Sequence, residues 1–131
     1  MPDLEKNLII YRLNTAKEKS QASKVLLEAG FYKDSVSKSY YCMFSAIRAL
    51  LASCGVDFSK HAGVISYFQR EFIKTNIFDK KYSKYMASAF EARNNSDYDD
   101  FFIVSKADAQ IQYDRANELL EIIEKYLSER Y

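Results

Sequence analysis

Residues 32–55 read YKDSVSKSYYCMFSAIRALLASCG, and this stretch decides the fold class. Its apolar side chains recur at alternating spacings of four and three residues, which places them along one face of an α-helix. A second stripe makes the apolar surface wider than one neighbouring helix would cover. This helix is therefore predicted to lie centrally in a bundle or to form part of a dimer interface. The first stripe consists of Val36, Tyr40, Met43, Ile47, Leu50 and Cys54, and the second of Tyr41, Phe44, Arg48 and Leu51.

The flanking sequence continues this helical pattern on both sides. The chain has 131 residues with only three glycines and one proline, so helix breakers are rare. We therefore predict an all-α fold and a single domain over residues 1–131. Short links between long helices favour antiparallel neighbours in an up-and-down bundle. The predicted helices span about residues 3–29, 32–53, 62–74, 79–95 and 106–128.

Capping residues mark the ends of the first and last predicted helices. Asp3 is predicted to be the N-cap of the first helix, and Gly30 to end it in a left-handed conformation. Ser105, with Asp108 three residues later, predicts the start of the last helix. The inward face of the first helix is predicted to consist of Leu4, Leu8, Tyr11, Thr15, Ala22, Leu26 and Ala29.

Composition and charge exclude several classes of protein. The 19 basic and 18 acidic side chains leave a net charge of +1, so any contact with RNA must be local. No apolar run approaches the ~20 residues of a membrane span. The N-terminal residues also lack the basic start and apolar stretch of a signal peptide. We therefore expect a cytoplasmic protein that has no membrane segment.

Cysteine and histidine are too few to predict a disulfide or a metal centre. Cys42 and Cys54 lie in one predicted helix, roughly 18 Å apart, which is too far for a disulfide. Both are expected to be small buried side chains. Asp97, Asp99 and Asp100 could chelate a divalent cation, but neighbouring acidic residues in a loop usually face water. We therefore expect neither a metal nor a cofactor.

Arg93 breaks the apolar stripe of the fourth predicted helix. The stripe runs through Tyr82, Met86 and Ala89 and reaches Arg93 at the next position. Because a buried charge needs a partner, Arg93 could turn outward and pair with Asp97, one helical turn later. Alternatively, it could present its planar guanidinium to a phosphate. The neighbouring polar residues, Asn94, Asn95 and Ser96, would then supply neutral hydrogen-bonding groups.

His61 is the only histidine and stands at the start of the third predicted helix. Its ordinary pKa near 6.5 makes it the only ready-made base for neutral pH. A single histidine at a helix start is also often a capping or surface residue, and both interpretations stay open. Several tyrosines lie on inward stripes and are predicted to be packing residues, namely Tyr11, Tyr40, Tyr82 and Tyr113.

Three stretches, in this order and at this spacing, resemble the small stand-alone HEPN proteins of bacteria and archaea. They are residues 39–46, residues 60–65, and Arg93 to Tyr98 with the Asp99-Asp100-Phe101 run that follows. The resemblance implies a bundle of four to five helices that commonly forms a homodimer. It also implies a toxin–antitoxin pair with a minimal nucleotidyltransferase, in which the HEPN protein is a metal-independent ribonuclease.

In that family the ribonuclease motif is Arg, four to six residues, and then His. Arg93 corresponds to the motif arginine, and Asn94 to the polar residue that commonly follows it. Tyr98 stands at the histidine position, and tyrosine, with an ordinary pKa near 10, is a poor base at pH 7. From the resemblance, and from the spacing of Asp97 one turn after Arg93, we expect Arg93, Tyr98 and Asp97 to be the catalytic residues. Asn94, Tyr41 and His61 are the expected residues for binding substrate or nucleotide.

The substitution of the motif histidine leaves four interpretations open. The chain could cleave RNA with Tyr98 as an acid, or with His61 or Asp97 as a base that the fold brings in. It could be a non-catalytic nucleotide- or RNA-binding subunit of a nucleotidyltransferase, using Arg93 to hold phosphate. Tyr98 could accept a nucleotidyl group from that partner. Finally, the chain could be a dimeric scaffold that has no small-molecule chemistry.

Overall fold

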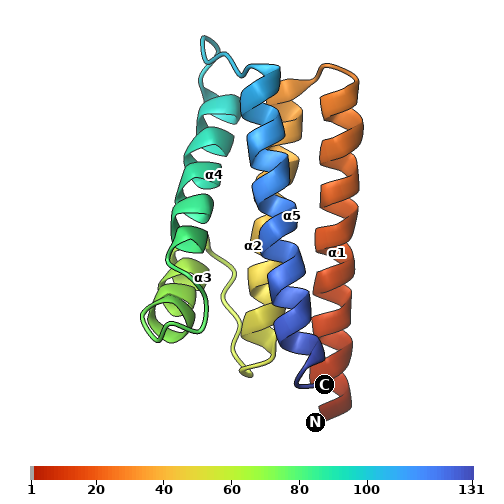
Figure 1. Ribbon diagram of the computed structural model, residues 1–131, viewed down its shortest axis with the longest axis vertical. Helices are drawn as coiled ribbons and strands as arrows, with labels where there is room; N and C mark the ends of the chain where they lie inside the picture. Colours follow the sequence, from red (N-terminus) through yellow and green to blue (C-terminus); the bar gives the residue numbers. More distant parts are fainter. Residues whose placement is uncertain (1) are drawn as a thin grey trace.

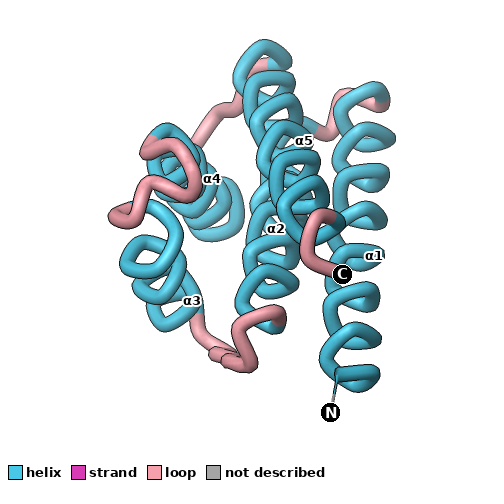
Figure 2. The backbone as a smooth tube through the Cα atoms, turned by 60° about the horizontal axis from the view of Figure 1, so that its bottom comes forward, coloured by secondary structure: helices cyan, strands magenta, loops and turns pink. Residues whose placement is uncertain are grey.

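The computed structural model describes residues 2–131, and this range contains five α-helices and no strand. The all-α prediction is therefore confirmed. Three long helices, α1, α2 and α5, run side by side, and α4 lies next to them (Figure 1). The short α3 lies near the N-terminal end of α4 (Figures 1 and 2). The bounds are α1 Pro2–Glu28, α2 Tyr32–Ala52, α3 His61–Phe68, α4 Lys81–Tyr98 and α5 Lys106–Ser128, with a π-helical turn at Gln69–Ile73.

The central position of α2 explains its wide apolar surface. This helix contacts α1, α3, α4 and α5, and its predicted first stripe is buried from Val36 to Leu50. One side of α2 is only half-buried, and we call it the open face of α2. The open face consists of Ser37, Tyr41, Phe44 and Arg48. The sequence predicted either a central position in the bundle or a part in a dimer interface, and the structure places α2 in the centre of the bundle.

The inward face of α1 differs from the predicted one. Leu4 is 65% exposed and Tyr11 is 69% exposed, so the predicted stripe, and the packing role of Tyr11, are wrong. The buried positions include polar residues whose hydrogen bonds are satisfied inside the bundle. Ser23 bonds to the hydroxyls of Ser35 and Ser39 at 2.9 and 2.7 Å. The observed face consists of Ile9, Arg12, Ala16, Ser20, Ser23 and Leu27.

The helix ends agree with the prediction for α5 and partly for α1. The hydroxyl of Ser105 accepts a hydrogen bond from the amide of Asp108 at 3.0 Å, which confirms the predicted cap. Gly30 has a φ of 86°, the left-handed conformation that glycine adopts without strain. Asp3 lies within the first turn of α1, so it is not the N-cap. At this position its negative charge interacts favourably with the positive end of the helix dipole.

The end of α4 matters most for the site. The helix was predicted to end at about residue 95, but it continues to Tyr98, so Asp97 and Tyr98 belong to its last turn. The helical geometry therefore fixes Asp97 one turn beyond Arg93.

The two cysteines have different surroundings. Cys42 is fully buried in α2, where burial, and next the charge of Glu124, raise the pKa of its thiol to about 12. Cys54 lies beyond the end of α2 and is exposed, so its predicted burial is wrong. Among residues 2–131, no helix is both long and apolar enough to cross a membrane.

Candidate functional site

Arg93 lies at the interface between α4 and α2. The residues before it on the same stripe, Tyr82, Met86 and Ala89, are buried, and α4 carries Arg93 toward α2 at the next position. Its side chain is only 20% exposed. The charge therefore lies where the helical pattern requires an apolar group, and it needs compensation from its neighbours.

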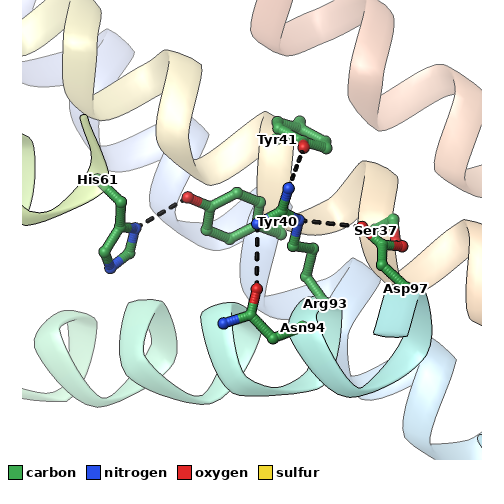
Figure 3. Close-up of polar contacts among 7 residues, drawn as sticks. All are labelled: Ser37, Tyr40, Tyr41, His61, Arg93, Asn94 and Asp97. Atoms are coloured by element: carbon green, nitrogen blue, oxygen red, sulfur yellow. Dashed lines mark hydrogen bonds and ion pairs between the residues drawn. The ribbon is translucent and has the colours of Figure 1, made fainter. Parts of the chain in front are cut away.

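Three side chains provide this compensation (Figure 3). Nη2 of Arg93 donates a hydrogen bond to the Tyr41 hydroxyl at 2.8 Å, and Nη1 donates to Oδ1 of Asn94 at 3.1 Å. Nε lies 3.1 Å from Oδ2 of Asp97, an ion pair whose N–H is not aligned for a hydrogen bond. Ser37 in turn donates to Oδ1 of Asp97 at 2.8 Å. These contacts hold the guanidinium between α2 and the last turns of α4.

Aromatic rings surround the same guanidinium. Its central carbon lies 5.4 Å from the ring centre of Tyr40, 5.3 Å from that of Tyr41 and 6.0 Å from that of Tyr98. Such distances allow cation–π attraction. Burial opposes the charge of Arg93, but Tyr41, Asp97 and Tyr98 outweigh this effect and raise its pKa. Arg93 is therefore a permanent cation at this site.

His61 joins the site through Tyr40. Its Nδ1 lies 2.8 Å from the Tyr40 hydroxyl, and its ring stacks on Phe90 with centres 3.7 Å apart. Burial, and next the positive charge of Arg93, lower the pKa of His61 below its ordinary value. Burial also raises the pKa of Tyr40 to about 12, against the opposing charge of Arg93. At pH 7 the imidazole is therefore neutral and the Tyr40 phenol keeps its proton.

The structure brings together most, but not all, of the predicted site residues. Arg93, Asn94, Asp97 and Tyr41 are in direct contact. Tyr98 lies at the exposed edge, with 77% of its surface accessible. His61 contacts Arg93 only indirectly, because the Tyr40 ring lies between them (Figure 3).

Sequence reasoning missed three residues that complete the site. Tyr40 was predicted only to pack in the core, yet it touches both His61 and Arg93. Ser37 lies one turn before Tyr41 on the same face of α2, a spacing that could have indicated its role. Nothing in the sequence indicated a role for Phe90, because only the packing of α3 against α4 places its ring against the imidazole of His61.

The carboxylates of the acidic residues after Arg93 do not gather around one point. Among the described residues, no group of three His, Cys, Asp or Glu side chains is arranged to hold a metal ion. Asp97 faces Arg93 and Ser37. Asp99 instead accepts a hydrogen bond from the amide of Phe101 at 3.0 Å and so shapes the turn after α4.

Comparisons with known proteins agree with this architecture. The sequence profile described as "HEPN domain" matches residues 10–126. A Methanocaldococcus jannaschii protein named "Putative toxin MJ0142" is 34% identical over 88% of this chain and 78% of its own length. A "UPF0332 protein" of Thermotoga maritima is 31% identical over 95% of each chain. A second Methanocaldococcus jannaschii protein, "Putative toxin MJ0605", is 31% identical over 66% of this chain and 64% of its own length.

Proposed function

The chain belongs to the HEPN domain family, and from this premise we propose that it is a toxin-like endoribonuclease that works without a metal ion. One observation carries the proposal. A permanent cation, Arg93, and the only imidazole of the chain, which is neutral at pH 7, contact the same tyrosine ring from two sides. Two relatives carry the name "Putative toxin", which supports a toxin-like function.

In the proposed reaction, Arg93 binds the phosphate that is cleaved. A guanidinium has five N–H groups, and only two of them donate hydrogen bonds to Tyr41 and Asn94. Nε–H is buried beside Asp97, so the second N–H of Nη1 and of Nη2 would donate to phosphate oxygens and stabilise the extra negative charge of the transition state. Asp97 has a positioning role here, because it is already paired with Arg93 and accepts a hydrogen bond from Ser37.

His61 is the proposed base. When Nδ1–H of His61 donates to the Tyr40 oxygen, the lone pair of Nε2 is free to accept the proton of the ribose 2′-hydroxyl. The 2′-oxygen then forms a bond to phosphorus, and the bond between phosphorus and the 5′-oxygen breaks. Tyr98, at the exposed edge beside Arg93, is the proposed donor of the proton that the departing oxygen takes. The products are a 2′,3′-cyclic phosphate and a 5′-hydroxyl.

A second candidate function is a non-catalytic subunit that binds nucleotide or RNA for a nucleotidyltransferase. Two observations favour it: Asp97 already neutralises part of the Arg93 charge, and a tyrosine stands at the motif histidine position. Inducible expression in a bacterial host separates the two functions. A ribonuclease should arrest growth and fragment cellular RNA within one generation. Intact RNA in cells that contain folded protein would leave the binding subunit as the remaining function.

Tyr41→Phe tests whether the Tyr41 hydroxyl orients Arg93. Removing the hydroxyl deletes the 2.8 Å hydrogen bond and keeps the ring. We expect RNA cleavage to fall by about 10- to 150-fold, because a hydrogen bond to a charged group contributes ~1.5–3 kcal/mol. Tyr126→Phe, whose ring lies in α5 against Phe72 and Phe78, is the matched control. Equal cleavage rates for wild type and Tyr41→Phe would show that Arg93 does not need this contact.

We also propose that the protein acts as a homodimer through its second and fourth helices. The open face of α2 leaves Tyr41 and Phe44 half-buried beside the site, and a second copy would exclude water there. Sedimentation velocity should therefore give a species of twice the 15.2 kDa of one chain. A species of one-chain mass over the whole accessible concentration range would contradict the dimer.

An antitoxin-like minimal nucleotidyltransferase is the proposed protein partner. The names of two relatives, "Putative toxin", support an antitoxin partner, and the resemblance to the HEPN family suggests that this partner is a nucleotidyltransferase. Co-expression with a nucleotidyltransferase encoded beside this chain should yield a stable complex and restore growth. If the two proteins elute separately in chromatography and growth stays arrested, the proposed pairing is wrong.

A further inference from the structure

The segment that joins α2 to α3 determines where His61 lies (Figure 2). This joining segment, residues 53–60, is mostly exposed, and His61 is the first residue of α3 after it. Lys60 occupies the N-cap position of α3, and its side chain has no acceptor for the free amides of the first turn. The position of His61 therefore depends on how the joining segment is attached to the bundle.

Asp57 attaches the joining segment to two long helices. Its Oδ1 lies 3.0 Å from Nη2 of Arg12 in α1 and 2.9 Å from Nη2 of Arg48 in α2. The hydrogen bond from Arg48 is the main cause that lowers the pKa of Asp57, and the charge of Arg12 acts in the same direction. At pH 7 one charged carboxylate is therefore shared by two cations.

The buried arginine makes this attachment firmer than an ordinary surface ion pair. A single exposed pair contributes little, because two long side chains must be ordered in competition with water. The Arg12 side chain is only 10% exposed, and its Nη1 already donates a hydrogen bond to the carbonyl of Arg48 at 3.0 Å. It therefore loses little conformational freedom when it binds Asp57.

Phe58 connects this attachment to the first turns of α3. A Cβ atom at Gly63 would lie 2.9 Å from Cδ1 of Phe58, so the Phe58 ring packs closely on Gly63. The centre of the Phe58 ring also lies 6.0 Å from that of Tyr67, one turn further along α3. Because Phe58 directly follows Asp57, the point of attachment is one residue away from the contact with α3.

We propose that Asp57 is a positioning residue for the proposed base. Through its two arginine partners it fixes the joining segment, and this holds the imidazole of His61 against the Tyr40 hydroxyl and the Phe90 ring. Asp57 acts through His61 and not on the RNA. The expected loss of cleavage rests on the proposed function, whereas the expected change at His61 is measured without any RNA.

Asp57→Asn tests this role by NMR of the His61 imidazole. The substitution keeps the shape of the side chain but leaves only weaker, neutral hydrogen bonds to the arginines. If the joining segment loosens, His61 leaves its stack on Phe90, and its ring protons shift as the ring current of Phe90 is lost. Its pKa should then rise toward 6.5, because burial is the main cause that lowers it. A direct charge effect has the opposite sign, since loss of a nearby negative charge lowers the pKa of a histidine.

RNA cleavage gives a second readout. We expect kcat of Asp57→Asn to fall by ~10–100-fold, because the base is held outside its productive geometry. KM should change by less than about twofold, since the phosphate-binding Arg93 and its partners are untouched. Asp57→Ala removes both ion pairs and should have a larger effect in the same direction.

Glu124→Gln is the matched control. Glu124 of α5 pairs with Lys17 of α1 at 3.0 Å, so this variant also loses an ion pair between separate parts of the bundle. Its His61 signals and its cleavage rate should equal those of wild type. Circular dichroism should show the same helical signal for Asp57→Asn and Glu124→Gln, which excludes unfolding as the cause.

Two results separate this inference from the proposed function. A pKa of His61 that stays unchanged or falls in both Asp57→Asn and Asp57→Ala, with unchanged ring-proton signals, would overturn the positioning role whatever the cleavage rate. A raised pKa of His61 in these variants, with RNA left intact by the wild type as well, would support the positioning role and overturn the ribonuclease function.

Discussion

Arg93→Gln is expected to lower RNA cleavage by ~10²–10³-fold, the loss typical of removing one group that stabilises the charge of a transition state. Glutamine keeps a hydrogen-bond donor near Tyr41 but removes the positive charge that would face the phosphate. The substitution also leaves Asp97 without its ion-pair partner, so the local charge changes from balanced to negative. Cleavage of a labelled RNA by purified protein measures the effect.

The control for Arg93→Gln is a charge change of the same kind elsewhere. Arg70 is largely exposed and pairs with its neighbour Glu71, so Arg70→Gln should cleave RNA like wild type. Circular dichroism should give the same helical signal for both variants, which excludes unfolding as the cause. Cleavage by Arg93→Gln within threefold of wild type would exclude Arg93 from the reaction.

The second large effect concerns His61 as the base. His61→Gln should lower cleavage by ~10²–10⁴-fold, the usual contribution of general acid–base catalysis. The base must be neutral to accept a proton, and burial together with Arg93 lowers the pKa of His61 below 6.5. The wild-type rate should therefore rise with pH through this lowered pKa, at a lower pH than an ordinary histidine would give.

NMR measures this pKa directly, because the chain contains a single histidine and its imidazole signals need no assignment. In Arg93→Gln the nearby positive charge is gone, so the pKa of His61 should rise and the acid limb of any residual activity should move to higher pH. The pKa of His61 is lower in the folded chain than in the unfolded chain. His61 therefore contributes stability above pH 6.5, and this contribution is lost as the pH falls through the folded-state pKa. A wild-type pKa at or above 6.5 would contradict this account.

The fold could be predicted where apolar spacing and capping agree. The spacing gave α2 and α5 nearly to the residue, and Ser105 marked the start of α5. It failed for α1, where the buried face contains Arg12 and Ser23. Arg12 donates to the carbonyl of Arg48 at 3.0 Å and pairs with Asp57 at 3.0 Å. Partners on distant segments satisfy these polar groups, and a pattern of apolar residues cannot reveal such partners.

The candidate site could be predicted in part. A charge that interrupts an apolar stripe identified Arg93, and helical spacing identified Asp97 as its neighbour. The placement of His61 could not be predicted, because it depends on how α3 packs against α2 and α4. The role of Tyr40 was hidden for the same reason: in sequence it belongs to a core stripe, and only the bundle places His61 and Arg93 on either side of its ring.

The chemical ends of the RNA fragments test the central claim most directly. Purified protein should be incubated with a defined RNA in excess chelator, and the fragments analysed by mass spectrometry beside those from Arg93→Gln. We predict fragments with 2′,3′-cyclic phosphate and 5′-hydroxyl ends in the wild-type reaction, at least about a hundredfold more abundant than with Arg93→Gln. Intact RNA, or equal amounts of such fragments with both proteins, would contradict an Arg93-dependent ribonuclease.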